Sequence, residues 1–393
     1  MDKGDQEGAA YSTGLGTIIR EWTRIGCVGF GGPPTHISFF RRLCVEQRSW
    51  MDESDFEDAI AATNLLPGPA STQLAIFCAW RLRGAAGAVI GGVCFIIPGL
   101  LLILLLAFFL MSSHSPVWVL GASAGAGAAV PAVALNASWS LAPASHRRIG
   151  VRRSQKVRWV VYAAIGAAAT LALGSSLVLV LLACGLAELL IRQKRPRPSS
   201  TPAGTALGGL VSHTAVVGTL GAVAWVALKV GALSYGGGFV IVPLMQHDAV
   251  NTYHWLSGAQ FLDAVALGQI TPGPVVQTVA AVGYAAAGFG GGLLAAVVAF
   301  TPSFLFVLIG APRFDQIRKN VDIQAFLTGA GPAVIGAIAG SAISLALAVQ
   351  HLWQIPILAG SLIWLLTRSR SVVTCLLIAG AIGIIVALAG VTV

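Results

Sequence analysis

The sequence has few charged residues. Only 10% of its 393 residues are Asp, Glu, Lys or Arg, whereas 56% are hydrophobic. Soluble domains carry about 25% charged residues, so the composition excludes an ordinary soluble domain. Long apolar runs recur, for example at 88–111 and 372–391, and each can supply the roughly 20 helical residues that cross a bilayer. We therefore expect an all-α polytopic membrane protein in the lipid bilayer of the cell membrane.

Signatures of several other protein classes are also missing. The apolar segments carry no clustered carboxylates, no Walker A motif and no G-x-S-x-G, so we expect no enzyme. The net charge of +9 comes from Lys and Arg in short loops beside apolar segments, which the positive-inside rule explains without nucleic acid. Six cysteines are scattered without metal-ligand spacing, so we expect no metal site and no cofactor: Cys27, Cys44, Cys78, Cys94, Cys184 and Cys375.

A repeat divides the chain into two halves. When the sequence is shifted by 205 residues, a glycine pair and a Pro-Gly-Pro triplet recur, and 11 of 41 positions are identical over 29–69. We predict a first repeat at 14–191, a basic Pro/Ser-rich linker at 192–203 and a second repeat at 204–393. The recurring motifs are Gly31-Gly32 with Gly236-Gly237, and Pro67-Gly68-Pro69 with Pro272-Gly273-Pro274.

Lys and Arg occupy complementary loops in the two halves. In the first half they follow the first, second, fourth and sixth apolar segments, and in the second half they follow the third and fifth. Because basic loops stay in the cytoplasm, this placement predicts two repeats of opposite orientation. Opposite orientation requires an odd number of crossings from six segments, so one segment must re-enter. We assign re-entry to the Pro-Gly-Pro segment, which predicts about ten crossings, two re-entrant hairpins and both termini outside.

Each Pro-Gly-Pro triplet interrupts an apolar segment. Proline inside a helix costs about 3 kcal/mol and breaks the backbone hydrogen bonds, and lipid tolerates broken backbone only inside protein or beside a watery cavity. Pro69 and Pro274 suit the first turn of a new helix, whose free amides and positive dipole end attract anions. The triplets therefore predict an anion site at two helix starts, and a plain packing kink is the alternative.

Two basic residues just before the glycine pairs form a further matched pair, and the glycine pairs themselves are candidates too. Arg24 and Lys229 lie within the apolar thickness, where ionisable groups are costly and usually functional, so they are candidate anion ligands. Snorkelling to the headgroups is the alternative. The glycine pairs at 31–32 and 236–237 allow close approach of backbone to a ligand, although helix packing through small residues explains them equally well.

Two polar pairs complete the candidate residues. Gln73 and Gln277 follow the triplets and could donate amide hydrogens to an oxyanion. Asp58 and Asp263 align with each other across the repeat. They fit the negatively charged start of a helix, and the alternative role is proton coupling.

These motifs resemble those of the chromate ion transporter family in its long, two-domain form. The similarity covers residues 15–310 strongly, with Thr35 where that family usually has Ala and Tyr235 where it often has Phe. The segments that carry it are "GFGGPPTHI" at 29–37, "LLPGPASTQLAIF" at 65–77, "RLRGAAGA" at 81–88, "SYGGGFVIVPL" at 234–244 and "QFLDAVALGQITPGPVVQT" at 260–278.

The resemblance implies export of chromate from the cytoplasm and hence chromate resistance, with sulfate as a similar tetrahedral dianion. A dianion that leaves a cell with a negative interior gains about 4.6 kcal/mol per 100 mV, so voltage alone could drive export. A carrier or channel for sulfate or another anion is the alternative. The sequence leaves open whether the chain works alone or as a homodimer.

Overall fold

The structure is a computed structural model of the chain. The residues that it describes do not include Pro67, Gly236, Gly237, most of the linker, or 313–319 of the basic loop at 313–320, which we predict to be cytoplasmic. The described residues are 13–64, 66, 68–111, 115–147, 149, 152–172, 177–193, 218–234, 239–311, 320–367 and 371–392. Within these ranges every regular element is helical, as the composition predicts.

The two halves contain matching series of helices. The first half has α1 (Leu15–Val28), α2 (Pro33–Arg41), the π-helix η1 (Arg42–Gln47), α3 (Glu53–Thr63), α4 (Ala70–Leu110), α5 (Val117–Arg147), α6 (Arg153–Ala172) and α7 (Leu177–Gln193). The second has α8 (Thr219–Leu233), α9 (Ile241–Gln246), the π-helix η3 (His247–Thr252), α10 (Gly258–Ile270), the 3₁₀ turn η4 (Val275–Gln277), α11 (Thr278–Gly310), α13 (Val321–Leu347), α14 (Gln354–Thr367) and α15 (Val372–Leu388).

Unusual backbone conformations recur at matching positions. Ser49 and His254 have φ of 49° and 53°, and Gly84 and Gly288 have φ of 58° and 62°. The last two residues bend α4 and α11, so each of these helices is a short piece followed by a long one. The correspondence therefore extends from the sequence to the backbone.

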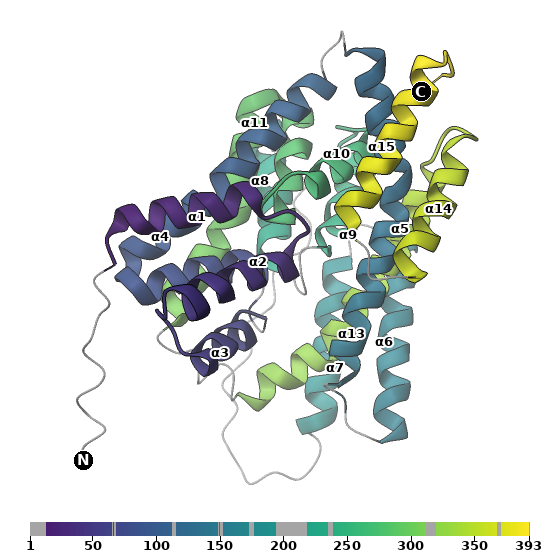
Figure 1. Ribbon diagram of the computed structural model, residues 1–393. Coiled ribbons are helices and arrows are strands. Elements are labelled where there is room, and N and C mark those ends of the chain that lie inside the picture. Colours follow the sequence, from purple (N-terminus) through teal and green to yellow (C-terminus); the bar gives the residue numbers. More distant parts are fainter. Residues whose placement is uncertain are drawn as a thin grey trace, which may run out of the picture.

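The helices form two bundles that stand beside each other (Figure 1). In one bundle, α1 packs on α4, α8 packs on α11, and α4 packs on α11. In the other, α5 packs on α14 and α15, while α13 packs on α6 and α7. Each bundle thus contains helices from both halves, and neither half forms a separate globule.

Matching helices run in opposite directions where they pack. Gly92 of α4 faces the ring of Phe304 in α11, while Leu104, later in α4, faces the earlier Gly292 of α11. In the other bundle the Ser138 hydroxyl donates to the Ile335 carbonyl oxygen at 3.0 Å, and Ser145, later in α5, lies near the earlier Gly331 of α13. Both helix pairs are therefore antiparallel.

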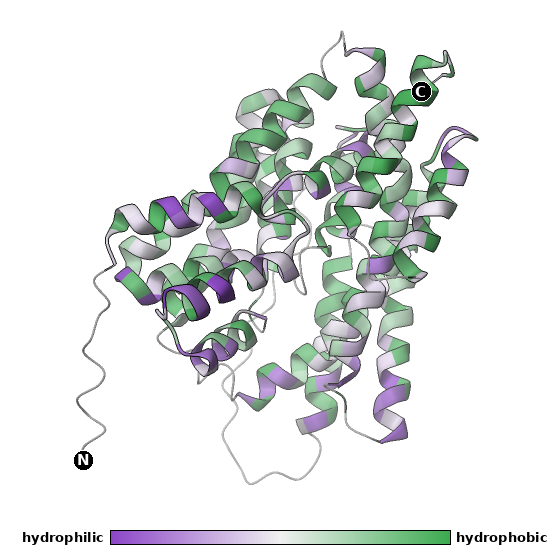
Figure 2. Cartoon of the chain, in the orientation of Figure 1, coloured by the Kyte–Doolittle hydropathy of each residue, from purple (hydrophilic) through white to green (hydrophobic). Residues whose placement is uncertain are grey.

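The outer surface fits a bilayer. In the part of the chain that the structure describes, four helical segments are long and apolar enough to cross a membrane: Ala70–Leu110, Val117–Arg147, Val275–Gly310 and Val321–Leu347. Leu101, Phe108, Ile309 and Ile385 are large apolar side chains on the outside. Hydrophilic residues gather at one end of α6 and α7 (Figure 2). The chain is a multi-pass membrane protein, and its exact number of crossings remains a prediction.

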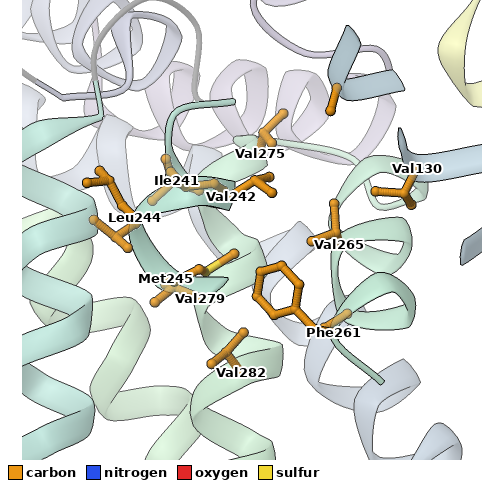
Figure 3. Packing of buried hydrophobic residues seen from close by; sticks show 14 of the residues in the cluster. Val130, Ile241, Val242, Leu244, Met245, Phe261, Val265, Val275, Val279 and Val282 are labelled. Atoms are coloured by element: carbon orange, nitrogen blue, oxygen red, sulfur yellow. The ribbon is translucent and has the colours of Figure 1, made fainter. Parts of the chain in front are cut away.

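Apolar packing fixes α10 between the bundles. Phe261 and Val265 on α10 lie close to Met245 of α9 and Val279 of α11, and Val130 of α5 approaches from the other bundle (Figure 3). All five side chains are buried. Burial of apolar side chains stabilises such contacts by about 1.5–3 kcal/mol each relative to exposure to water, which holds the second Pro-Gly-Pro turn in place.

Candidate functional site

A cavity of about 420 Å³ lies between the two bundles. One wall comes from the segments around the first glycine pair and the first Pro-Gly-Pro turn, with Phe239 from the second half. The other wall comes from α5, α13 and the start of α15. The lining residues are Gly31, Pro33, Pro34, Asn64, Ala70, Phe239, Asn136, Ala137, Ser140, Leu141, Ala144, Ser145, Leu327, Thr328, Gly331, Val334, Ile335 and Val372.

The first Pro-Gly-Pro turn starts a helix at this cavity. Gly68 has φ of 116°, which only glycine adopts readily, and its N–H donates to the Ser234 carbonyl oxygen at 2.8 Å. Pro69 follows with φ −72° and ψ 104°, and α4 begins at Ala70, which lines the cavity. Pro69 therefore occupies the N-cap and not the first turn that the sequence predicted, because its ψ is extended.

The second turn is built in the same way. Gly273 has φ of 91°, and its N–H donates to the Gly29 carbonyl oxygen at 2.9 Å. Pro274 has φ −67° and ψ 130°, and the 3₁₀ turn η4 precedes α11. Since 29 and 234 are themselves 205 apart, each turn is held by the glycine-containing segment of the other half.

The glutamines lie behind the turns. Gln73 and Gln277 are fully buried, and the Gln277 Nε2 donates to the Ile96 carbonyl oxygen at 3.0 Å. A Cβ added to Gly68 would lie 2.5 Å from the Gln73 Nε2, and one added to Gly273 would lie 2.9 Å from the Gln277 Nε2. Both amides thus pack against the glycine of their own turn. Neither is among the cavity-lining residues, so their predicted contact with an anion remains a prediction.

The first glycine pair shapes the cavity wall. Gly31 and Gly32 have φ of 98° and 77°, and they turn the chain from α1 into α2. Gly32 is the N-cap of α2, where Pro33 and Pro34 follow at the first helical positions. Gly31 and both prolines line the cavity. The second pair, Gly236 and Gly237, lies outside the described residues.

Arg24 is engaged in an ion-pair network. Its guanidinium lies 3.0 Å from the Oε2 of Glu21, and the buried Glu21 also meets Arg20 at 2.9 Å and Arg48 at 3.3 Å. The Arg24 side chain is 58% exposed and is not among the cavity-lining residues. The structure therefore places Arg24 away from the cavity, and its predicted role in anion binding is untested.

Lys229 is paired more tightly. Its ammonium group bonds to the carboxylate of Asp248, which is buried in η3, and the Lys229 side chain is only 12% exposed. The ammonium also lies 5.7 Å from the centre of the Trp225 ring, a cation–π distance. Like Arg24, Lys229 is absent from the described lining of the cavity.

The two matched aspartates have different surroundings. Asp58 is exposed on α3, and Asp263 is partly buried on α10 facing α5. Asp263 lines a second cavity, at the other end of α5 from the first. The repeat pairs these residues in the sequence, but the fold separates their environments.

The first cavity is lined by neutral groups. Its described lining has no charged side chain, but it offers hydroxyl and amide donors from Asn64, Asn136, Ser140, Ser145 and Thr328. Ala70 and Ser71 begin α4, where amides have no partner within the helix. Such a site suits an anion held by hydrogen bonds. No group of three His, Cys, Asp or Glu that could hold a metal occurs among the described residues.

The sequence did not single out the polar lining. Asn136 and Ser145 of α5 have no repeat partner of similar polarity, because Gly340 and Val349 occupy the equivalent positions. Ser140 aligns with Ser344, but a lone serine in an apolar helix does not indicate a cavity. Asn64 offered a better signal, because Gln269 carries the same amide group at the equivalent position before the second Pro-Gly-Pro turn.

Paired broken helices, apolar spans and an uncharged cavity with a few polar side chains between the bundles define an integral membrane protein with an internal site. The sequence pattern of the chromate transporter family matches residues 16–189 and again 221–384. The chain therefore belongs to the chromate transporter family. That the pattern matches once in each half agrees with the sequence repeat.

Several curated relatives resemble the chain over most of their length. It is 32% identical to a chromate transport protein of Cupriavidus metallidurans over 93% of this chain and 91% of the relative. It is 32% identical to a probable chromate transport protein of Synechococcus elongatus over 86% and 85%. It is 30% identical to a chromate transport protein of Pseudomonas aeruginosa over 84% and 80%. No solved structure matches the chain.

Proposed function

We propose that the chain is a carrier that exports chromate from the cytoplasm across the cell membrane and so gives chromate resistance. The observation that carries this proposal is the start of α4 at Ala70, which lines an uncharged cavity with several hydrogen-bonding side chains between the bundles. A helix start carries about half a positive charge and free amide donors, and both favour an oxyanion. The membership in the chromate transporter family supports chromate as that oxyanion.

Neutral donors suit a carrier because the anion must also leave. A fixed, unpaired cation in the cavity would hold a dianion tightly and slow its release. Amides and hydroxyls from Ala70, Asn64, Asn136 and Thr328 can replace water around the four oxygens of chromate without adding charge. We therefore place the anion at the start of α4, between Asn64 and the α5 wall.

We also propose that the two halves have opposite orientations in the bilayer, with about ten crossings. The antiparallel packing of α4 with α11 and of α5 with α13 supports this arrangement. In it, α3 with the first piece of α4, and α10 with η4 and the first piece of α11, are the re-entrant hairpins. The cavity reaches Ser145, two residues before Arg147, and thus approaches the basic, cytoplasmic end of α5.

Arg24 and Lys229 remain proposed anion ligands outside the cavity described here. Their support is the matched position ahead of both glycine segments. Such a role requires the pairs with Glu21 and Asp248 to open while the anion passes.

Transport in vesicles tests the proposal. Purified protein in liposomes should move chromate toward the positive side of an imposed voltage, and cells that express it should accumulate less chromate and tolerate more. Faster transport of sulfate than of chromate would favour the sulfate carrier instead. Transport of neither anion would overturn the proposal.

A further inference from the structure

The second cavity has a volume of about 320 Å³ and lies at the opposite end of α5 from the first. It is bounded by α5, by the beginning of α10 and by the connection from α13 to α14. Its lining is richer in polar side chains than that of the first cavity. The lining residues are Leu120, Ser123, Ala124, Gly127, Ser257, Ala259, Gln260, Leu262, Asp263, Ala348, Gln350, His351 and Gln354.

The two cavities are counterparts in the repeat. In this part of the chain the halves align with a shift of 204 residues. Ser123, Ala124 and Gly127 of the second cavity correspond to Leu327, Thr328 and Gly331 of the first. Ala348 likewise corresponds to Ala144. The second cavity is thus the smaller counterpart of the first, about 320 against 420 Å³, at the other end of α5, and its described lining does not include the Pro-Gly-Pro turn.

The two matched aspartates differ in exposure between the half beside the first cavity and the half beside the smaller second cavity. In the half that contributes Asn64 and Ala70 to the first cavity, Asp58 is exposed to solvent and lies outside the cavity lining. Beside the second cavity, its counterpart Asp263 is packed against α5, where a Cβ added to Gly127 would lie 3.0 Å from the Asp263 Oδ1. Any residue larger than glycine at 127 would press on the carboxyl group. If the halves exchanged shapes, Asp263 would become exposed as Asp58 is now.

We propose that Asp263 is a proton-binding site that is loaded from the second cavity, on the external side, and that it carries a proton when this cavity is narrow. When the cavity opens, Asp263 returns that proton to the external solution. The proposal rests on the opposite orientation of the two halves proposed above. External protons would then favour the form that is open toward the cytoplasm.

The hydrogen bonds around Asp263 fit a neutral carboxyl group. The Ser123 hydroxyl donates to the Leu120 carbonyl oxygen at 3.0 Å and lies beside the Asp263 carboxyl group. Ser123 has a single hydrogen, so it can donate to only one of them. A protonated Asp263 can donate to the Ser123 oxygen while Ser123 donates to Leu120, and both bonds are then made. An ionised Asp263 has no hydrogen to donate, so one bond is lost.

Few other titratable groups surround this site. Within the described lining the other one is His351, and α5 between 120 and 127, α14 and the rest of α10 have none. Elements packed on α10 add Cys375 on α15 and Tyr284 on α11. Farther along the packed elements are Arg81, Arg83, Cys78 and Cys94 on α4 and His247 and Asp248 on η3. Asp263 is thus the carboxyl group of the second cavity.

Cysteine labelling at Ala124 tests the proposal without any substrate. The Ala124→Cys variant is reconstituted in liposomes, and a membrane-impermeant maleimide is added at a series of external pH values. Labelling is counted above that of the parent, which corrects for the native cysteines. Since opening releases one proton, the open fraction should rise up to about tenfold per pH unit until opening is complete. The Asp263→Asn variant removes this rise and leaves only the intrinsic pH dependence of the thiol.

Matched variants separate the outcomes. Asp58→Asn should follow the parent, because Asp58 lies outside both cavities. If Asp263→Asn does not reach the membrane, Asp263→Ser makes the same comparison. Equal pH profiles with and without Asp263 would overturn the proton site. Labelling of Ala124→Cys only from the cytoplasmic side would overturn its external access and the orientation on which it rests. Neither result depends on whether chromate is the substrate.

Discussion

The Pro-Gly-Pro turns agree between the two halves, whereas the ion pairs do not. Gly68 and Gly273 both have positive φ, and each donates to the opposite half. By contrast, Glu21 pairs with Arg24, but the residue equivalent to Glu21 in the second half is Val226. Asp248 pairs with Lys229, but the residue equivalent to Asp248 in the first half is Leu43. The backbone that frames the cavities is therefore common to both halves, and the charges beside it are particular to each.

We therefore expect the shared turns and the unshared ion pairs to contribute to the protein in different ways, the turns to transport and the ion pairs to stability. A backbone frame with equivalent turns allows each half to adopt the same two conformations. Alternating access of a site to the two sides of a membrane requires such a pair of conformations. An ion pair that occurs in one half alone stabilises the helices it joins, and this role requires no equivalent pair in the other half. Substitutions at the turns should therefore act alike in both halves, and substitutions at the charges should act differently.

The largest effect is expected at the turns. Gly68→Ala and Gly273→Ala force a Cβ into positive φ, at a cost of about 1–3 kcal/mol each, and press it against Gln73 or Gln277. We expect both variants to lose chromate transport and to unfold at lower temperature. Gly290→Ala is the control, because it is helical and exposed with no atom within 4 Å of an added Cβ. A variant at one turn with full activity would break the equivalence.

The next largest effect, a loss of stability, is expected for Lys229→Ala. It leaves the buried carboxylate of Asp248 without its cation, which costs about 3–5 kcal/mol. The measurement is thermal unfolding in detergent. The double variant Lys229→Met/Asp248→Leu removes both charges and should recover most of the stability. If the double variant regains stability but not transport, Lys229 also contributes to anion binding, whereas recovery of both would assign it a structural role.

A charge in the first cavity should act on transport alone. Asn136→Asp keeps the size of the side chain but adds a negative charge to a neutral lining. Two unit charges about 4 Å apart repel by about 4 kcal/mol near a protein surface, so chromate transport should fall by more than about 100-fold at unchanged thermal stability. Asn136→Ser keeps a polar neutral group and should transport measurably. Equal rates for the two variants would contradict an anion site there.

The smallest effect among the ion-pair variants is expected at Arg24. Its side chain is largely exposed, and Glu21 keeps Arg20 and Arg48 as partners, so Arg24→Ala should cost less than about 1 kcal/mol. If Arg24 binds the anion, the initial rate of chromate transport falls in this variant but not in Arg20→Ala. The same rate in both would assign Arg24 to the ion-pair network alone.

Local rules predicted the breaks in the helices. Proline and glycine act on their own backbone, so the triplets at 67–69 and 272–274 indicated two interrupted helices before any tertiary contact was known. The repeat added their equivalence. It did not predict that each turn bonds to the other half, because that contact depends on how the halves interleave.

The partners of the charges could not be predicted in the same way. Glu21 and Asp248 meet their cations through helix packing, and neither has a charged counterpart in the repeat. Lone Asn136 in an alanine-rich helix gave no periodic signal that it faces a cavity. The alignment of Asp58 with Asp263 was visible, but only packing against Gly127 separates their surroundings.

The most direct test of the account is a structure of the protein with bound chromate. We expect a tetrahedral ion in the cavity between the bundles, about 2.7–3.2 Å from the amides of Ala70 or Ser71 and from the side chain of Asn64 or Asn136. An ion bound only at Arg24 or at a surface loop, with this cavity empty, would contradict the account.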